Sequence, residues 1–186
     1  MPRNHGEFDS VSDAILSTAA RLFTQNGIHG TSLNDIAKEA NLSKGTLYYY
    51  YPAKEQLVLD IASQNIANIT DVVFAWVDSL MRDEALRPAV ARLLNTLTED
   101  THRMRLHIVL CTESACGNSS LQSLLGDAYR EWTVMLEVGT LKLQSQNSKL
   151  VHSRAQLFFA CLDGFMLQNS AKLSDLDKLT IIERLF

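Results

Sequence analysis

The chain has 186 residues, a size typical of one domain or of two small domains that share a core. Its 8 glycines and 3 prolines are about half of what average usage gives, which argues against turn-rich all-β folds and favours helices. The formal net charge is −4, and residues 1–55 carry 5 Lys and Arg against 6 Asp and Glu, which excludes a protein coated in positive charge for nucleic acid.

The sequence lacks the signals of membrane insertion and export. No apolar run approaches the ~18 residues that a membrane span needs, and the first ten residues are polar. The cysteines Cys111, Cys116 and Cys161 are odd in number and have no Cys-x-x-Cys spacing, which argues against disulfides and structural zinc. We therefore expect a cytoplasmic protein with no cofactor and no metal site.

The first part of the chain predicts three helices. Residues 11–25 place apolar side chains three and four apart, and residues 33–40 repeat this spacing over a shorter stretch. Residues 41–43 form a tight turn, and a third helix over residues 44–51 must finish before Pro52. Two short helices thus meet across a three-residue turn behind a longer helix, which is the layout of a helix-turn-helix DNA reader.

Apolar spacing predicts six further helices, which makes the chain an all-α protein of about nine helices. These helices span residues 53–81, 86–101, 104–116, 120–144, 153–172 and 174–186.

The third helix has two chemically different sides. One side carries Leu47, Tyr50 and Tyr51, and the opposite side carries Gly45, Tyr48 and Tyr49, with Thr46 beside it. Phenol hydroxyls can donate to phosphate oxygens, phenol rings can lie against thymine methyls, and a glycine lets the helix start approach DNA closely. The alternative is that the tyrosines are partly buried anchors of a short helix.

Lys44 and Lys54 each lie in the first turn of a predicted helix, where the helix dipole disfavours a cation. A phosphate bound at each helix start would turn this mismatch into an advantage. The alternative is two solvated surface lysines.

The stretches Thr31-Ser32-Leu33-Asn34-Asp35-Ile36-Ala37 and Leu42 to Leu57 resemble the DNA-binding segment of TetR-family transcriptional regulators. The resemblance implies an N-terminal helix-turn-helix domain over residues 1–52 and a helical bundle over residues 53–186 for dimerisation and ligand binding. It implies a DNA-facing set of Thr31, Ser32, Ser43, Lys44, Gly45, Thr46, Tyr48, Tyr49, Tyr50 and Lys54. The chain departs from the family pattern at Tyr51, whose hydroxyl then needs a partner, and at Ala53, which leaves the next helix poorly capped.

The resemblance also implies the mechanism and the partners: a homodimeric repressor that binds double-stranded operator DNA and is released from it by a small-molecule effector. Candidate pocket residues are the large or polarizable side chains of the predicted interior, which are equally good core residues. They are Trp76, Met104, His107, Cys111, Tyr129, Trp132, Met135, Phe158 and Cys161.

The segment Leu157 to Leu162 is apolar on all sides and needs cover from more than one side, and Gly164 suggests close approach of another backbone. We therefore expect the last two helices to pack against their two-fold mates in a dimer interface, as the resemblance implies. The candidate interface residues are Phe158, Cys161, Gly164, Phe165, Gln168, Leu176, Leu179 and Ile182. Burial of these residues within one chain is the alternative.

Two other function classes remain open from the sequence. His107 and Cys111 lie four apart on one predicted helix, so a cysteine-based redox sensor or enzyme is one alternative, with Glu113 as the nearby group that would orient the histidine. The other is a helical interaction module whose reader does not contact DNA.

Overall fold

The computed structural model describes residues 5–82, 84–143 and 148–186. In these ranges the chain forms helices joined by short connections, without strands. The helices are α1 (His5–Asn26), α2 (Leu33–Glu39), α3 (Lys44–Tyr50), α4 (Lys54–Ser79), α5 (Leu86–Glu99), α6 (Thr101–Ala115), α7 (Ser119–Leu143), α8 (Ser148–Ser170) and α9 (Lys178–Leu185). The all-α, nine-helix prediction is confirmed for the described part of the chain.

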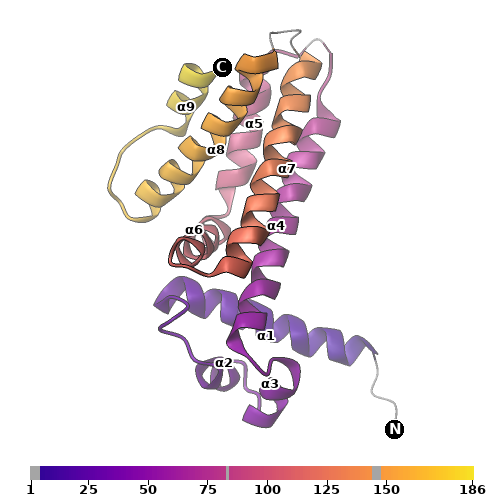
Figure 1. The fold of residues 1–186 in the computed structure, drawn as a ribbon, viewed down its shortest axis with the longest axis vertical. Coiled ribbons are helices and arrows are strands. Elements are labelled where there is room, and N and C mark those ends of the chain that lie inside the picture. The colour runs from indigo at the N-terminus through magenta and orange to yellow at the C-terminus, as the bar shows by residue number, and fades with distance from the viewer. Residues whose placement is uncertain (1–4, 83, 144–147) are drawn as a thin grey trace.

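The helices form a small lower unit and a taller upper bundle (Figure 1). Helices α1, α2 and α3 make the lower unit, and α4 rises out of it into the bundle. In the bundle α7 packs against both α4 and α8, while α9 packs against α5 and α8. Helix α6 crosses at the level where the two parts meet, and it packs against α1 below and against α7 and α8 above.

Local sequence signals set the ends of the lower helices as predicted. Helix α1 stops at Asn26 because Gly27 adopts a left-handed backbone with φ of 76°. Ser32 caps α2 in a capping box, in which its hydroxyl accepts from Asp35 N and the Asp35 carboxylate accepts from Ser32 N. Ala53 gives α4 no side-chain cap, as the sequence indicates.

Asp100 joins two helices without a linker. It is the C-cap of α5 and the N-cap of α6, where its carboxylate accepts from the backbone N–H groups of His102 and Arg103. These hydrogen bonds hold the pKa of Asp100 below its usual value. Helix α6 therefore begins three residues earlier than the apolar spacing predicts, because the cap, and not an apolar side chain, starts it.

The ends of the first and last helices also differ from the prediction. The last helix starts at Lys178, after an N-cap at Asp177, so the predicted helical residues 174–177 are non-helical. Helix α1 extends to His5, ahead of the first apolar residue of its pattern.

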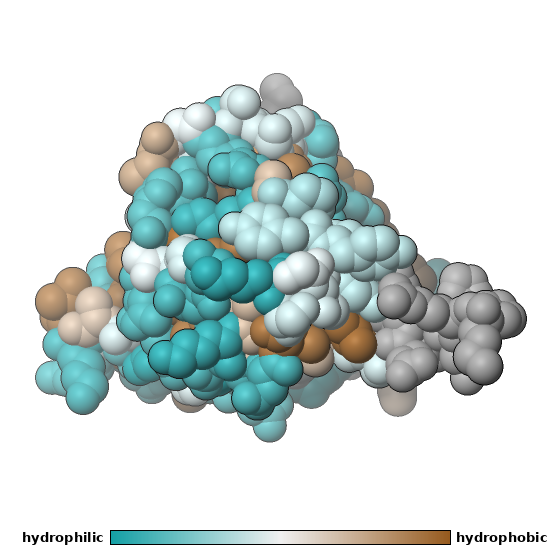
Figure 2. Space-filling model, turned by 90° about the horizontal axis from the view of Figure 1, so that it is seen from below, coloured by the Kyte–Doolittle hydropathy of each residue, from teal (hydrophilic) through white to brown (hydrophobic). Residues whose placement is uncertain are grey.

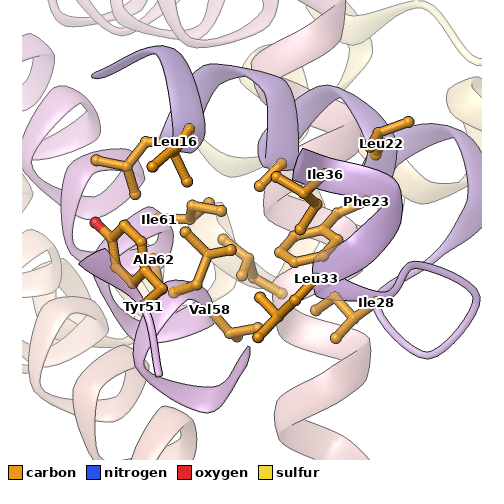
Figure 3. Close-up of a cluster of buried hydrophobic side chains, with 14 of the residues drawn as sticks. Leu16, Leu22, Phe23, Ile28, Leu33, Ile36, Tyr51, Val58, Ile61 and Ala62 are labelled. Carbon is orange, nitrogen blue, oxygen red and sulfur yellow. The ribbon is translucent and has the colours of Figure 1, made fainter. Parts of the chain in front are cut away.

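Two clusters of buried side chains form the core. The lower cluster joins α1, α2 and α3 to the start of α4 and to parts of α6 and α7. Figure 3 shows part of it, with Tyr51 beside Val58 and Ile61. The upper cluster fills the bundle around Trp76, Trp132 and Phe158. None of the helices in the described ranges is long and apolar enough to cross a membrane.

Candidate functional site

The turn between α2 and α3 has the geometry that a helix-turn-helix needs. Asn41 adopts a left-handed backbone with φ of 55°, which reverses the chain direction. Ser43 then caps α3, with its hydroxyl accepting from Thr46 N at 3.0 Å. The two hydroxyls of Ser43 and Thr46 also lie 2.8 Å apart. This short network fixes the start of α3 on the surface of the molecule.

Helix α3 divides into a buried and an exposed side as the sequence predicts. Leu47 is completely buried in the lower core, and Tyr51, at the C-terminal cap, is 5% exposed. Tyr48 and Tyr49 are 45% and 64% exposed. Tyr50 lies between these extremes: it packs against the lower core, and its ring meets that of Tyr49 edge-on at 5.5 Å. The exposed side can therefore contact DNA while Leu47 anchors the helix.

Burial raises the pKa of the Tyr51 hydroxyl, and a hydrogen bond with Ser12 opposes this rise. The partner that the sequence requires for this hydroxyl is thus present in α1.

Gly45 is exposed, and the backbone conformation at this position does not require a glycine. A Cβ at this position would meet only the Ser43 hydroxyl, at 3.8 Å, and the backbone is not left-handed. Glycine lowers helix stability relative to alanine. Folding therefore gives no reason for this glycine, whereas close approach of another molecule would.

The two lysines occupy different settings. Lys44 is exposed at the start of α3. Lys54 is half-buried, and its ammonium donates to the carbonyls of Ile28 at 2.9 Å and Thr31 at 3.2 Å. An ammonium has three N–H donors, so one remains for a phosphate. Lys54 thus fastens the α1–α2 connection to α4.

Thr31 and Ser32 differ in burial. Thr31 is 1% exposed, and its hydroxyl donates to Gly27 O at 2.9 Å. Ser32 is exposed, with its hydroxyl 2.6 Å from the Asp35 carboxylate, whose pKa is lowered by this hydrogen bond. The structure therefore places Ser32 at the surface and Thr31 inside.

The end of the molecule that carries α2 and α3 is mainly hydrophilic (Figure 2). Acids are part of it, since Asp35 and Glu39 lie on α2. Glu39 is paired with Arg21 at 2.7 Å, so its charge is balanced within the lower unit.

A second candidate site lies inside the bundle. A cavity of about 20 Å³, room for roughly one water molecule, is enclosed by α4, α5, α6, α7 and α8. Its walls are Ile69, Leu97, Arg103, Met104, His107, Tyr129, Trp132, Phe159, Leu162, Asp163 and Met166. Four of the predicted pocket residues, Met104, His107, Tyr129 and Trp132, are among them.

The other predicted pocket residues lie elsewhere. Cys111 borders the same polar corner, with its sulfur 3.5 Å from His107 Nε2. Trp76 donates its indole N–H to Ala89 O at 2.7 Å and borders a separate groove. Phe158 is buried against Phe159 and Phe186 in the upper core. Met135 and Cys161 are half-buried and do not line the cavity.

One corner of the cavity is polar and joins four helices. His107 of α6 lies 3.3 Å from the Asn65 amide of α4 through Nδ1 and 2.8 Å from the Tyr129 hydroxyl of α7 through Nε2. Tyr129 donates to Asp163 of α8 at 2.6 Å, and Asp163 also lies 3.5 Å from His107 Nε2.

Burial alone would lower the pKa of His107, but the hydrogen bonds to Asp163 and Cys111 raise it to about 9. Burial and the neighbouring negative charges raise the pKa of Tyr129. The corner therefore holds a protonated histidine beside a carboxylate.

Sequence reasoning missed Asp163, Asn65 and Phe159 as site residues. A signal existed for Asp163, because it is an acid in an otherwise apolar helical segment. Glu113, predicted as the group that orients His107, instead contacts His29 Nε2 at 3.0 Å.

Exposed apolar side chains lie on the outer side of α7 and α8, where the His152–Glu137 pair also joins the two helices. These apolar side chains are Val134, Val138 and Leu141 on α7 and Leu150 and Leu157 on α8. Gly164 lies on α8 with no atom within 4 Å of where a Cβ would be. Cys161 and Phe165 are half-buried, and Gln168, Leu176 and Leu179 are exposed. Phe158 and Ile182 are buried in this chain's own core, so they are not at its surface.

The fold and the exposed side of α3 define the chain as a helix-turn-helix DNA-binding protein. The sequence profile of the bacterial regulatory proteins of the tetR family matches residues 15–61. The HTH-type transcriptional regulator LmrA of Bacillus subtilis is 32% identical over 130 residues, which cover 67% of this chain and 68% of LmrA. The chain therefore belongs to the tetR family of bacterial transcriptional regulators.

Solved structures share the fold over nearly the whole chain. A regulator from Saccharomonospora viridis in complex with choline has a TM-score of 0.79 at 22% identity and covers 95% of this chain and 94% of its own. The multidrug binding protein EbrR complexed with imidazole has a TM-score of 0.68 at 22% identity, covering 94% of this chain and 92% of its own.

Proposed function

We propose that the protein is a homodimeric repressor that binds operator DNA through residues 1–52 and is released by a small molecule held within residues 53–186. The observation that carries this proposal is the exposure of Tyr48 and Tyr49 on a helix whose opposite side is fixed in the core by Leu47. A helix presented in this way can enter a major groove without rearranging the protein. The protein would meet its operator in the cytoplasm.

The DNA-facing set consists of Ser32, Ser43, Lys44, Gly45, Thr46, Tyr48, Tyr49 and Tyr50, with Lys54 contributing its remaining N–H donor. Thr31 supports this set from inside through its bond to Gly27 O. Phosphate contacts would come from Lys44 and the hydroxyl groups, and base contacts from the tyrosines.

The homodimer pairs the α7–α8 face with its two-fold mate. This face carries exposed apolar side chains, and the open space beside Gly164 allows a second backbone to approach. Two-fold symmetry would place the two α3 helices on successive major grooves of a palindromic site.

The interior cavity is the proposed effector site, because it joins an apolar wall to a polar corner within the bundle. Two solved structures with this fold carry choline and imidazole, which supports a ligand-binding role for the protein. An effector that binds better to the conformation unsuited to DNA lowers operator affinity by its preference for that conformation. We propose no catalytic role, since the relatives are transcriptional regulators.

Binding to the DNA upstream of the protein's own gene, measured by fluorescence anisotropy across a salt series, tests this function. We expect a dimer that binds this DNA sequence-specifically. The logarithm of its association constant should fall linearly with the logarithm of the salt concentration. Equal affinity for the upstream DNA and for scrambled DNA of the same length, or a monomer on gel filtration, would contradict it.

A further inference from the structure

The Asp163 side chain stands between the interior cavity and the outside. Tyr129, Phe159 and Asp163 line the cavity, and the same three residues line a groove of about 510 Å³ on the outer side of α7 and α8. The Asp163 side chain is 32% exposed, whereas that of His107 is 4% exposed. The carboxylate can therefore turn into this groove, which shares Val134 with the proposed dimer face, but the imidazole cannot.

The charges of the cavity are unequal. Arg103 and His107 are the cationic groups among the residues that line it, and Asp163 is the one acid in that lining. The shift of the His107 pKa to about 9 means that the imidazole carries its proton at neutral pH. Once Asp163 turns outward, the corner offers a histidine N–H, a phenol O–H and a nearby guanidinium, all of them donors. Because burial alone lowers the pKa of His107, the imidazole keeps its proton only when another anion takes the place of the Asp163 carboxylate.

The rest of the wall is apolar and adaptable. Ile69, Leu97 and Leu162 line it together with Met104 and Met166. Methionine side chains repack easily around different shapes. At about 20 Å³ the cavity must widen to admit any organic molecule, and the adjoining groove supplies space once Asp163 moves.

We propose that the effector is a small organic acid with an apolar body, whose carboxylate replaces that of Asp163 against His107 and Tyr129. This inference rests on the proposed function, because it names the ligand class and the regulation of that same site. Asp163 is then an internal stand-in that holds the site closed in the absence of the acid.

Helix α6 carries the effect to the DNA-binding unit. It contributes His107 to the corner, and it contributes Leu106 and Leu110 to the lower core that α1 shares. At its other end Glu113 contacts His29 in the α1–α2 connection at 3.0 Å. Widening of the cavity displaces α6, and this displacement changes how α1 packs against α6.

Matched probes that differ only in their polar group test the proposal. Octanoate, octan-1-ol and octyltrimethylammonium share a straight chain, and 4-phenylbutyrate and 4-phenylbutan-1-ol share an aromatic body. Binding to the dimer of this chain is measured by calorimetry, with tryptophan fluorescence as a second readout, since Trp132 lines the cavity. We expect each acid to bind at least about ten-fold more tightly than its alcohol. Acids that bind no better than their alcohols, or an ammonium probe that binds best, would overturn the proposal.

Two substitutions change the acid affinity in opposite directions. Asp163→Asn removes the competing charge, so octanoate affinity should rise by about ten-fold while that of octan-1-ol is unchanged. His107→Gln removes the anion's partner, so octanoate loses its advantage over octan-1-ol. His102→Gln, at an exposed position of the same helix, is the matched control and should bind all probes as the wild type does.

Circular dichroism and operator binding of each variant without probe show that it is folded. A weaker octanoate complex in folded Asp163→Asn would overturn the proposal even if His107→Gln misfolds. Operator binding without probe tests the proposed function separately, so normal DNA binding combined with indifference to acids rejects only the ligand class.

Discussion

The ammonium of Lys54, in the first turn of α4, donates to the carbonyl of Ile28 in the α1–α2 connection at 2.9 Å. The contact spans two elements that are distant in sequence, and a second bond to Thr31 O extends it. The helix dipole disfavours a cation at this position of α4, but Lys54 donates hydrogen bonds to loop carbonyls of the lower unit. These hydrogen bonds are a structural reason for the lysine.

Lys54→Met should lower the free energy of unfolding by about 1–3 kcal/mol, because two half-buried carbonyls lose a charged donor. Urea unfolding followed by circular dichroism measures this. Lys44→Met, at an exposed position, is the control and should unfold as the wild type does. Equal stability of the Lys54 variant and the wild type would show that the two bonds contribute nothing.

Tyr49→Ala and Lys44→Ala should both weaken operator binding. Tyr49 is 64% exposed and Lys44 is exposed, so neither change disturbs the core. Loss of a phosphate contact at Lys44 should also reduce the slope of log affinity against log salt by about one. Fluorescence anisotropy across a salt series checks both variants.

Arg87→Ala is the matched control for these two variants, since this exposed cation lies at the start of α5, remote from α3. Wild-type affinity and slope in the Lys44 and Tyr49 variants would remove α3 from the DNA interface.

Gly45→Ala separates folding from recognition. An added methyl group meets only the Ser43 hydroxyl at 3.8 Å, so the variant should be as stable as the wild type or more stable by up to ~1 kcal/mol. Operator affinity should nevertheless fall, because the methyl group occupies space between α3 and the DNA. Thermal unfolding and anisotropy are measured on the same preparation, and unchanged affinity would mean that α3 does not approach the duplex closely at its start.

Gly139→Ala should destabilise the bundle. A Cβ at this position would lie 2.3 Å from Cζ3 of the Trp76 ring, so α4 and α7 would have to separate. Overpacking of this kind typically costs about 1–3 kcal/mol. Gly126→Ala on the same helix is the control, because its Cβ would meet only the end of Arg130 at 3.5 Å. Similar unfolding midpoints for the two variants would contradict the close packing of α4 on α7.

Stability should depend on pH through His107. Its pKa is raised from 6.5 to about 9 in the folded chain, so the folded state binds this proton more tightly than the unfolded state does. The resulting stabilisation is complete below about pH 6.5 and is lost as the pH rises through about 9. Urea unfolding at several pH values should show this decline in the wild type and in His102→Gln. The decline should be smaller in His107→Gln. Identical pH profiles for His107→Gln and the wild type would show that His107 is not the group responsible.

The sequence predicts local features well where one residue decides them. Gly27 ends α1, Ser32 and Ser43 cap α2 and α3, and the missing cap at Ala53 is visible from the residue type alone. The two sides of α3 follow from helical geometry, so the exposed Tyr48 and Tyr49 could be assigned in advance.

The interior site could not be predicted in the same way, because it depends on contacts between distant helices. The Tyr129 hydroxyl reaches Asp163, 34 residues away, and no periodicity records this pairing. The roles of Thr31 and Lys54 also depend on tertiary contacts, since their polar atoms bond to carbonyls that the local pattern does not reveal. Phe158 and Ile182 share apolar spacing with surface neighbours, and only packing shows that they lie inside.

The single aspartate that ends α5 and begins α6 has a mechanical consequence. Because no residues separate the two helices, a movement of α6 along its own axis would also have to move the end of α5, whereas a rotation about Asp100 would not. Such a rotation would displace the far end of α6 most, and there Glu113 contacts His29 of the lower unit. Asp100 would therefore be the pivot through which a small change at the cavity becomes a larger movement at the α1–α2 connection.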